Sequence, residues 1–189
     1  MNSSLQPTIL LWNCRSLQSK VRDLQFVLCS PMSTSLFAPY TVPYLVALTE
    51  CHTPVDAVLP TISSYSWSIF PGTSHGGGLA LLTHNSVSCT ELPNLPVLPS
   101  HADIHPNSAV MYRLIRFPRQ VPFIVGVVYL SPSTGGVSAF CASSLMNSFR
   151  AAASLSFPLL ILGDYFFITL FGCVQPPLML PPTSSHNSC

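Results

Sequence analysis

Three short apolar runs in this chain each end in a side chain that carries a polar oxygen. Residues Phe157–Asp164 and Tyr44–Glu50 end in a carboxylate, and Thr8–Asn13 end in a carboxamide. Apolar runs of this length are typical of strands that are buried on both faces of a sheet. Because only six of the 189 residues are acidic, two strands that end in a carboxylate indicate a site where hard oxygen ligands assist catalysis with a metal ion.

The composition describes one domain with a weakly charged surface. A chain of 189 residues can bury roughly 70% of the surface that its unfolded form exposes. Charged residues make up 7%, against a typical value of about 25%, and hydrophobic residues make up 48%. We therefore expect a surface that is prone to aggregate.

The net charge of +1 provides no general attraction for polyanions. Nucleic-acid binding would have to rest on a local cluster such as Arg113, Arg116 and Arg119. The same three residues are also consistent with a solvated strand face, which is the favoured interpretation.

The cysteines and the apolar segments indicate the cellular compartment. The seven cysteines are scattered, odd in number and without a CxxC pair, so they indicate neither a zinc site nor a disulfide framework. The N-terminus lacks the basic and continuous apolar regions of a signal peptide. The most apolar stretch, Phe157–Cys173, is interrupted at Gly163 and Asp164, and neither side approaches the ~20 residues of a membrane span. We expect a nuclear or cytoplasmic protein that is neither secreted nor membrane-bound.

Hydrophobic periodicity and turn residues predict a strand, a helix, a strand, two hairpins, a second helix and a last strand. The predicted strands are Thr8–Trp12, Tyr44–Leu48, Tyr65–Phe70, Leu79–Leu82, Ala109–Phe117, Phe123–Tyr129 and Leu159–Leu162, and the predicted helices are Ser16–Leu28 and Val137–Ala153. Loops are expected at Ser30–Pro43 and Thr90–Pro106. This order is consistent with a layered α/β or α+β sandwich.

Five segments taken together resemble the endonuclease/exonuclease/phosphatase superfamily, and within it the endonuclease domain of non-LTR (LINE-type) retrotransposons. The resemblance covers residues 8 to 166, and the segment Trp12–Leu17 favours the retrotransposon branch. The five segments are Ile9–Leu17, Leu45–His52, Gly76–Leu82, Val127–Pro132 and Ile161–Asp164.

The resemblance implies a fold, a reaction and a set of site residues. The implied fold is a four-layered α/β (α+β) sandwich of two packed mixed β-sheets flanked by helices. The implied reaction is hydrolysis of DNA phosphodiesters with Mg²⁺, or alternatively Mn²⁺, for target-site nicking. By position, Glu50 and Asn13 match the metal-binding residues, Asn13 also takes part in catalysis, Tyr129 lies near the scissile phosphate, and Asp164 orients or activates the attacking water.

The chain departs from the family pattern after Asp164. Where the family continues Gly-Asp-Phe-Asn, this chain has Gly163–Phe166, so an amide is replaced by a phenyl ring. The family also has a further Asp-bearing strand and a terminal Ser-Asp-His segment, but no acidic residue follows Asp164 here, and a serine precedes His186.

These departures predict a domain that is incomplete at its C-terminus. Residues 1–166 would form a partial domain, and 167–189, with four prolines in two pairs, an aberrant tail of foreign sequence, as from a frameshift, a splice or a decayed element. The predicted product is a truncated remnant with weak or no endonuclease activity.

Each site residue also has a structural interpretation. Glu50 and Asp164 can be solvated strand ends, Asn13 a loop or helix-capping residue, and Tyr129 a core residue. His52 is interpreted as a loop histidine, although it can also approach a substrate.

The glycine triplet and the function of the chain also have alternative interpretations. The triplet that begins at Gly76 fits a turn better than a phosphate cradle, because no lysine follows and no helix begins there. Two other functions stay open: a non-catalytic truncated product, and a phosphatase or repair nuclease of the same superfamily.

Overall fold

A computed structural model describes residues 8–29, 43–72, 77–93, 95, 108–131 and 139–165. In the described chain the strands are β1 (Ile9–Asn13), β2 (Leu45–Thr49), β3 (Tyr65–Phe70), β4 (Leu79–His84), β5 (Ser88–Glu91), β6 (Ala109–Arg116), β7 (Phe123–Leu130) and β8 (Leu159–Tyr165). The helices are α1 (Leu17–Cys29) and α3 (Ala139–Ala153).

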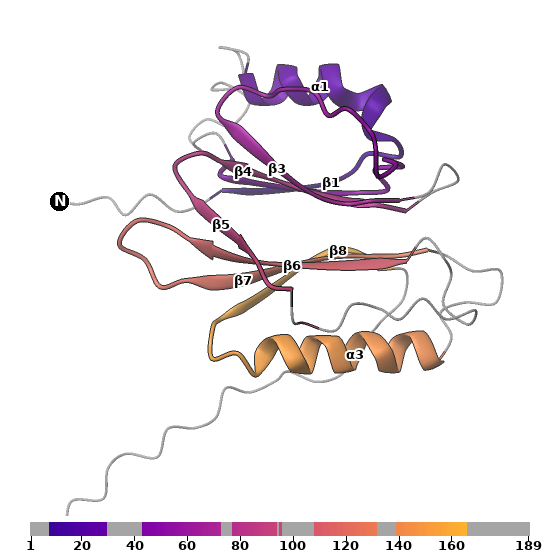
Figure 1. Cartoon of the computed structure of the whole chain (residues 1–189), viewed down its shortest axis with the longest axis vertical. Helices are drawn as coiled ribbons and strands as arrows, with labels where there is room; N and C mark the ends of the chain where they lie inside the picture. Colours follow the sequence, from indigo (N-terminus) through magenta and orange to yellow (C-terminus); the bar gives the residue numbers. More distant parts are fainter. Residues whose placement is uncertain are drawn as a thin grey trace, which may run out of the picture.

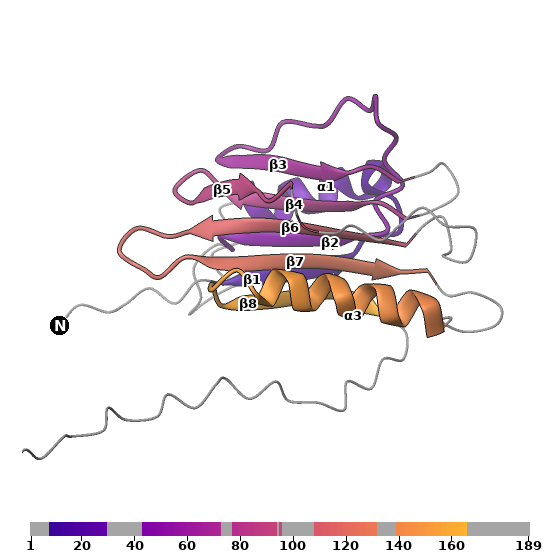
Figure 2. The same ribbon diagram turned by 60° about the horizontal axis from the view of Figure 1, so that its bottom comes forward.

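The elements stack in four layers (Figure 1). One helix, α1, covers the outer face of a sheet with strand order β1-β2-β4-β3, and α3 covers the outer face of a second sheet with order β5-β6-β7-β8. The two sheets pack against each other with their strands nearly aligned, and the axis of α3 follows the same direction (Figure 2). The predicted sandwich of two packed mixed sheets flanked by helices is confirmed.

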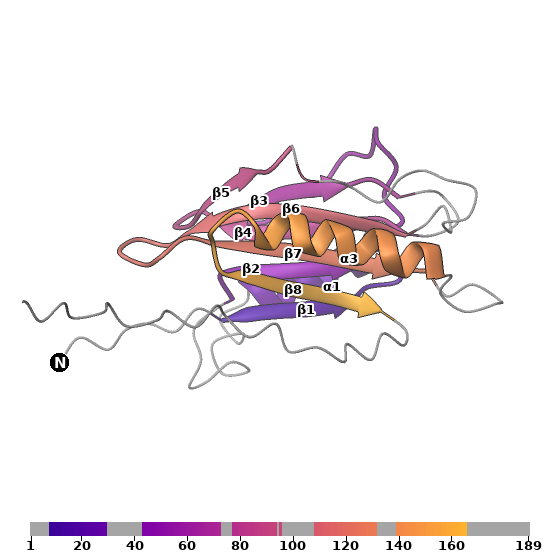
Figure 3. The same cartoon turned by 90° about the horizontal axis from the view of Figure 1, so that it is seen from below.

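Each sheet contains one parallel pair of strands. In the first sheet β1 pairs parallel with β2, and in the second β7 pairs parallel with β8, whereas the other neighbours are antiparallel. A helix connects the strands of each parallel pair, so the fold contains two βαβ units, β1-α1-β2 and β7-α3-β8. Among the described strands β1, β3, β5 and β8 are edge strands, and β1 and β8 lie at the same side of the sandwich (Figure 3).

Side-chain alternation along the strands builds three apolar layers. Along β2, Leu45 and Ala47 face the other sheet, whereas Val46 and Leu48 pack with α1. The α1 residues in that layer follow the predicted helical spacing and are Leu17, Val21, Leu24 and Leu28. The third layer lies between α3 and the second sheet and includes Leu145, which is fully buried.

The strand and helix predictions are confirmed with small shifts in their bounds, and both predicted hairpins are antiparallel pairs. One prediction is wrong: the loop expected from Thr90 begins instead with the last residues of β5, because a short polar strand has no apolar signal. The last strand also extends through Tyr165, so Asp164 lies within it.

Some predictions lie outside the described residues. These are most of the loop at Ser30–Pro43, most of the remaining loop up to Pro106, the tail 167–189 and His186. Within the described part of the chain, neither helix is long and apolar enough to cross a membrane.

Candidate active site

The side chain of Asn13 connects the two sheets at the carboxyl ends of their parallel strands. Its Nδ2 donates a hydrogen bond of 2.9 Å to Oε1 of Glu50 and a second of 2.7 Å to Oδ2 of Asp164. Asn13 ends β1, Glu50 follows β2, and Asp164 lies near the end of β8. These two hydrogen bonds join three of the four predicted site residues, although Asn13 and Asp164 are 151 positions apart in the sequence.

The two βαβ units explain why these residues meet. Within a parallel pair both strands end at the same edge of the sheet, so Asn13 lies beside Thr49 and Tyr129 lies beside Asp164. The sandwich then places these edges against each other, since β1 contacts β8 across the two sheets. Four strand ends therefore supply the candidate site.

The loops after β1 and β2 are held together by backbone hydrogen bonds. The amide of Cys14 donates to the carbonyl of Thr49 at 3.1 Å, and the amide of Ser16 donates to the carbonyl of Glu50 at 2.8 Å. Glu50 itself has a φ of 55°, and Arg15 has a φ of 48°. Left-handed backbone costs a residue with a side chain roughly 1–2 kcal/mol, and such strain concentrates at functional sites.

The glycine triplet supports the loop that carries Glu50. The carbonyls of Gly78 and Gly77 accept hydrogen bonds from the amides of Cys51 and His52, at 3.1 and 2.9 Å. Both glycines have a positive φ, of 79° and 73°. Their carbonyls thus serve as acceptors for the loop that follows Glu50. Gly76 lies outside the described residues, so the predicted turn stays a prediction.

Gly163 allows β8 to lie against β7 at the site. A Cβ atom built at this position would overlap the carbonyl oxygen of Val128, which is its register partner. Any side chain here would push the two strands apart. The glycine before Asp164 thus fixes how closely the carboxylate approaches the site.

Tyr129 lies beside the two carboxylates, and its side chain is buried. Burial, the negative charge of Glu50 and Asp164 and a hydrogen bond with Glu50 together raise the pKa of Tyr129 to about 12, although a hydrogen bond with Ser131 opposes the shift. The phenol is therefore protonated at neutral pH and can donate a hydrogen bond.

The charge of the site is unbalanced. Within the described residues the ion pairs are Lys20–Asp23 and Arg113–Glu91, and neither involves Glu50 or Asp164. The two carboxylates share one neutral amide as a common donor. Two half-buried anionic groups in contact with one amide match the preference of a divalent cation for hard oxygen ligands.

Asn13 presents its nitrogen, rather than its oxygen, to both carboxylates. Its Oδ1 accepts a hydrogen bond from the amide of Arg15 at 3.3 Å. In this geometry Asn13 orients Glu50 and Asp164, and its predicted role as a metal ligand stays a prediction, as do the predicted roles of the other three residues.

Three buried residues beside the site were not among the predicted residues. Thr49 is fully buried, and its hydroxyl has no hydrogen-bond partner in the described structure. Cys14 and Cys51, each 1% exposed, directly follow Asn13 and Glu50. Their adjacency depends on the register of β1 with β2, which the sequence does not reveal.

The arginine cluster does not form a separate basic patch. Arg113 pairs with Glu91 at 3.6 Å and donates to its neighbouring carbonyl, and Arg116 donates to Thr90 at 3.0 Å. Arg113 and Arg116 therefore both bind β5. The predicted solvated strand face is not formed by all three residues, because Arg119 lies in the turn between β6 and β7 and the side chain of Arg113 is only 11% exposed.

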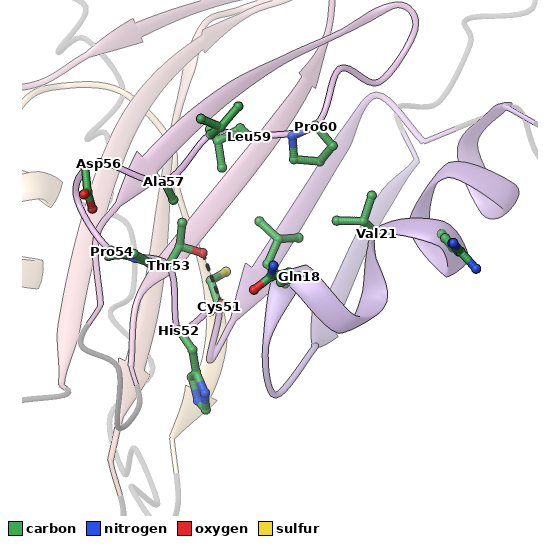
Figure 4. A pocket seen from close by; sticks show the side chains of 13 residues that line it. Gln18, Val21, Cys51, His52, Thr53, Pro54, Asp56, Ala57, Leu59 and Pro60 are labelled. Carbon is green, nitrogen blue, oxygen red and sulfur yellow. Dashed lines mark hydrogen bonds between the residues drawn. The ribbon is translucent and has the colours of Figure 1, made fainter.

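A cavity of about 720 Å³ lies between α1 and the loop that follows Glu50 (Figure 4). Cys51, Val21, Leu59 and Pro60 are among the residues that line it. His52 is also at its border, and its ring points away from the side chains of Leu59 and Pro60 in Figure 4. The histidine is thus placed on the loop after Glu50, as predicted.

No family model matches the chain, and no curated protein sequence matches it. Solved structures do match. A variant of the 3′ phosphatase NExo from Neisseria, bound to a product DNA hairpin, superposes with a TM-score of 0.54 and 16% identity over 84% of this chain and 57% of that chain. The human Nocturnin catalytic domain with bound sulfate gives a TM-score of 0.50 and 17% identity, with 82% and 63% covered. The mannosyl-6-phosphatase Bt3783 from Bacteroides thetaiotaomicron gives 0.52 and 9%, with 84% and 65% covered.

These likenesses concern the fold, and the chain spans 57 to 65% of the length of these three structures. They share the layered sandwich that carries the Asn13, Glu50 and Asp164 positions here. The chain therefore shares the fold of these three solved structures.

Proposed function

We propose that this chain carries the core of a divalent-cation-dependent phosphodiesterase that nicks DNA, of the kind found in the endonuclease domain of a LINE-type retrotransposon. The observation that carries the proposal is the contact of Asn13 with both Glu50 and Asp164. That contact unites the ends of two sheets in a cluster of carboxylates with no compensating cation among the described residues.

The proposed assignment gives each residue a chemical role. Glu50 would hold Mg²⁺ or Mn²⁺, which when bound supplies positive charge to offset the charge of the phosphodiester. Asn13 holds both carboxylates in place through its amide N–H groups. Asp164 accepts a hydrogen bond from the attacking water and orients it, and the protonated Tyr129 donates to a phosphate oxygen.

The resemblance of Trp12–Leu17 to the LINE-type domain supports the choice of DNA as substrate. The NExo variant is bound to a product DNA hairpin, which supports the same class of substrate. Phosphatases also share the fold, so a phosphomonoester is the second candidate substrate.

The test is nicking of supercoiled plasmid by the purified chain in Mg²⁺. We expect nicking by the wild-type chain and a loss of at least about 100-fold in Glu50→Gln and Asp164→Asn, since each removes an anionic oxygen from the site. Glu91→Gln and Asp23→Asn are matched controls, because both carboxylates are exposed and lie on β5 and α1.

The outcomes separate the candidate functions. Nicking that survives both site substitutions would come from a contaminant and would refute the proposal. Hydrolysis of p-nitrophenyl phosphate without nicking would favour the phosphatase. No activity toward either substrate from a folded chain would support the non-catalytic product.

A further inference from the structure

Two buried thiols that the proposed reaction does not use lie beside the site. Cys14 and Cys51 are each 1% exposed and pack in the same apolar layer, between α1 and the first sheet. The Sγ of Cys14 is 3.3 Å from the carbonyl oxygen of Thr49, and the Sγ of Cys51 is 3.7 Å from that of Leu48. The two acceptors are consecutive residues of β2, so both sulfur atoms lie at the same end of this strand.

The backbone around the pair is compatible with a covalent link. Cys14 continues β1 beside the end of β2, and adjacent strands lie about 4.8 Å apart. Hydrogen bonds hold the two loops together on both sides of the pair, from the amide of Cys14 to Thr49 at 3.1 Å and from the amide of Leu17 to Cys51 at 2.9 Å. A disulfide requires Cα atoms about 4.4–6.8 Å apart, a spacing that neighbouring strands provide without large movement.

The cavity described above provides a route for a small oxidant. Cys51 contributes to its lining, between α1 and the loop that follows Glu50 (Figure 4). A neutral molecule of the size of water, such as hydrogen peroxide, can enter a space of about 720 Å³. Cys51 is therefore buried from bulk solvent and yet borders an open space.

We propose that Cys14 and Cys51 form a reversible disulfide when the protein meets a peroxide. The two S–H bonds and the O–O bond of hydrogen peroxide break, one S–S bond forms, and two molecules of water leave. The thiol pair supplies two electrons, and the peroxide accepts them. The link joins the residue after Asn13 to the residue after Glu50, so it restrains the two loops that carry the candidate site.

The proposed link is not part of a structural disulfide framework, which the scattered cysteines do not indicate. A framework holds a small fold together, whereas here the fold is built without it and both thiols are free. The proposal does not depend on nuclease activity, because thiols are counted directly.

The first experiment uses a chain in which the other five cysteines, Cys29, Cys89, Cys141, Cys173 and Cys189, are replaced by serine. After peroxide treatment and quenching, thiols are counted in denaturant, and the chain is sized on a non-reducing gel. We expect two thiols before treatment, none after it, a monomeric band, and two thiols again after dithiothreitol. The matched control adds Cys51→Ser, and its remaining thiol should not be lost reversibly within the monomer.

Three results would overturn the proposal. The first is that both thiols persist in peroxide. The second is a loss of thiols that dithiothreitol does not reverse. The third is a loss of thiols that occurs only together with a disulfide-linked dimer.

A second measurement uses the wild-type chain, so the test does not depend on folding of the multiple variant. Peptide mapping by mass spectrometry after peroxide treatment should find a peptide with Cys14 linked to one with Cys51. The oxidised chain should also unfold at a higher temperature, because the link restrains the unfolded chain, and dithiothreitol should reverse the rise. Cys29→Ser, which removes an exposed thiol, should behave as wild type, and a map without the linked peptide would refute the proposal.

Discussion

At the scale of single residues, Asn13 lets two carboxylates occupy one site. Like charges close together repel, and a neutral amide that donates to both of them offsets part of this cost. The hydrogen bonds of 2.9 and 2.7 Å use both hydrogens of one NH₂ group. The chemistry of this position thus requires an amide rather than another acid of the same shape.

We therefore expect Asn13→Asp to destabilise the protein in a pH-dependent way. The change removes two hydrogen bonds to charged groups and adds a third negative charge, for a loss of about 2 kcal/mol or more in the free energy of unfolding at pH 7. Repulsion raises the pKa of the new carboxyl above the ordinary value of about 4, so the loss grows as the pH rises past about 4. Urea unfolding between pH 4 and 7 measures this trend.

The matched control for this substitution is Asn85→Asp. Asn85 is exposed and accepts a hydrogen bond from Ser66, which a carboxylate also accepts. Two outcomes would contradict the role assigned to Asn13. One is an equal loss of the free energy of unfolding in both variants at pH 7, and the other is a loss in Asn13→Asp that does not change with pH.

Tyr129 should make the folded state sensitive to alkaline pH. Its pKa is raised to about 12 in the folded protein, chiefly by burial, against about 10 in the unfolded chain. Between these values the unfolded chain loses the phenol proton first, so the free energy of unfolding falls as the pH rises from 10 to 12. At 1.36 kcal/mol for each pKa unit, the contribution of this one group is about 2–3 kcal/mol.

Tyr129→Phe isolates that contribution. Tyr65 and Tyr112 also have a raised pKa because of burial, so the wild-type chain loses stability from several groups. The variant should lose about 2–3 kcal/mol less than wild type between pH 10 and 12, as followed by urea unfolding. Parallel curves for the two proteins would show that the phenol of Tyr129 titrates normally.

At the scale of secondary structure, the sequence predicted the strands that are apolar and missed the one that is not. The runs that end at Asn13 and near Asp164 are apolar because these strands lie between a helix layer and the other sheet. In contrast, Ser88–Glu91 is polar and mostly exposed, and it forms a strand only because β6 is available as a partner. Such a tertiary effect leaves no local signal.

The site was predictable in its residue types but not in its contacts. Strand-end oxygens and the family resemblance identified Asn13, Glu50 and Asp164. The hydrogen bond between Asn13 and Asp164 crosses from one sheet to the other, and the order in which sheets stack depends on packing far from either residue. The neighbouring thiols of Cys14 and Cys51 could not be paired from the sequence either, because their adjacency depends on the register of β1 with β2.

Gly163→Ala should disturb the β7–β8 pair and leave the first sheet intact. The added methyl group would overlap the carbonyl of Val128, so β8 must shift, at a cost of about 2 kcal/mol or more in the free energy of unfolding. Hydrogen exchange should show faster exchange in Leu159–Tyr165. The amides of β2 and β4 act as the internal control, and unchanged protection of β8 would show that the strand tolerates a side chain here.

At the scale of the whole molecule, a low charge content is combined with exposed strand edges. Charged residues are 7% of the chain, and among the described strands β1 and β8 each have one hydrogen-bonded neighbour, at the same side of the sandwich (Figure 3). Exposed edge strands with few charges are sites of edge-to-edge association. Leu11, in the middle of β1, is 43% exposed.

A single charge on this edge should reduce self-association. Leu11→Lys places an ammonium group on β1, where a second sheet would otherwise pair, while the exposed position keeps the stability change within about 0.5–1 kcal/mol. We expect a lower weight-average mass in sedimentation at equal protein concentration and a higher solubility limit. Val121→Lys is the control, because this substitution adds the same charge at a different place. Val121 is 73% exposed and lies between β6 and β7, away from the edge strands β1 and β8. An equal rise in the solubility limit of both variants would mean that net charge, rather than the β1 edge, governs association.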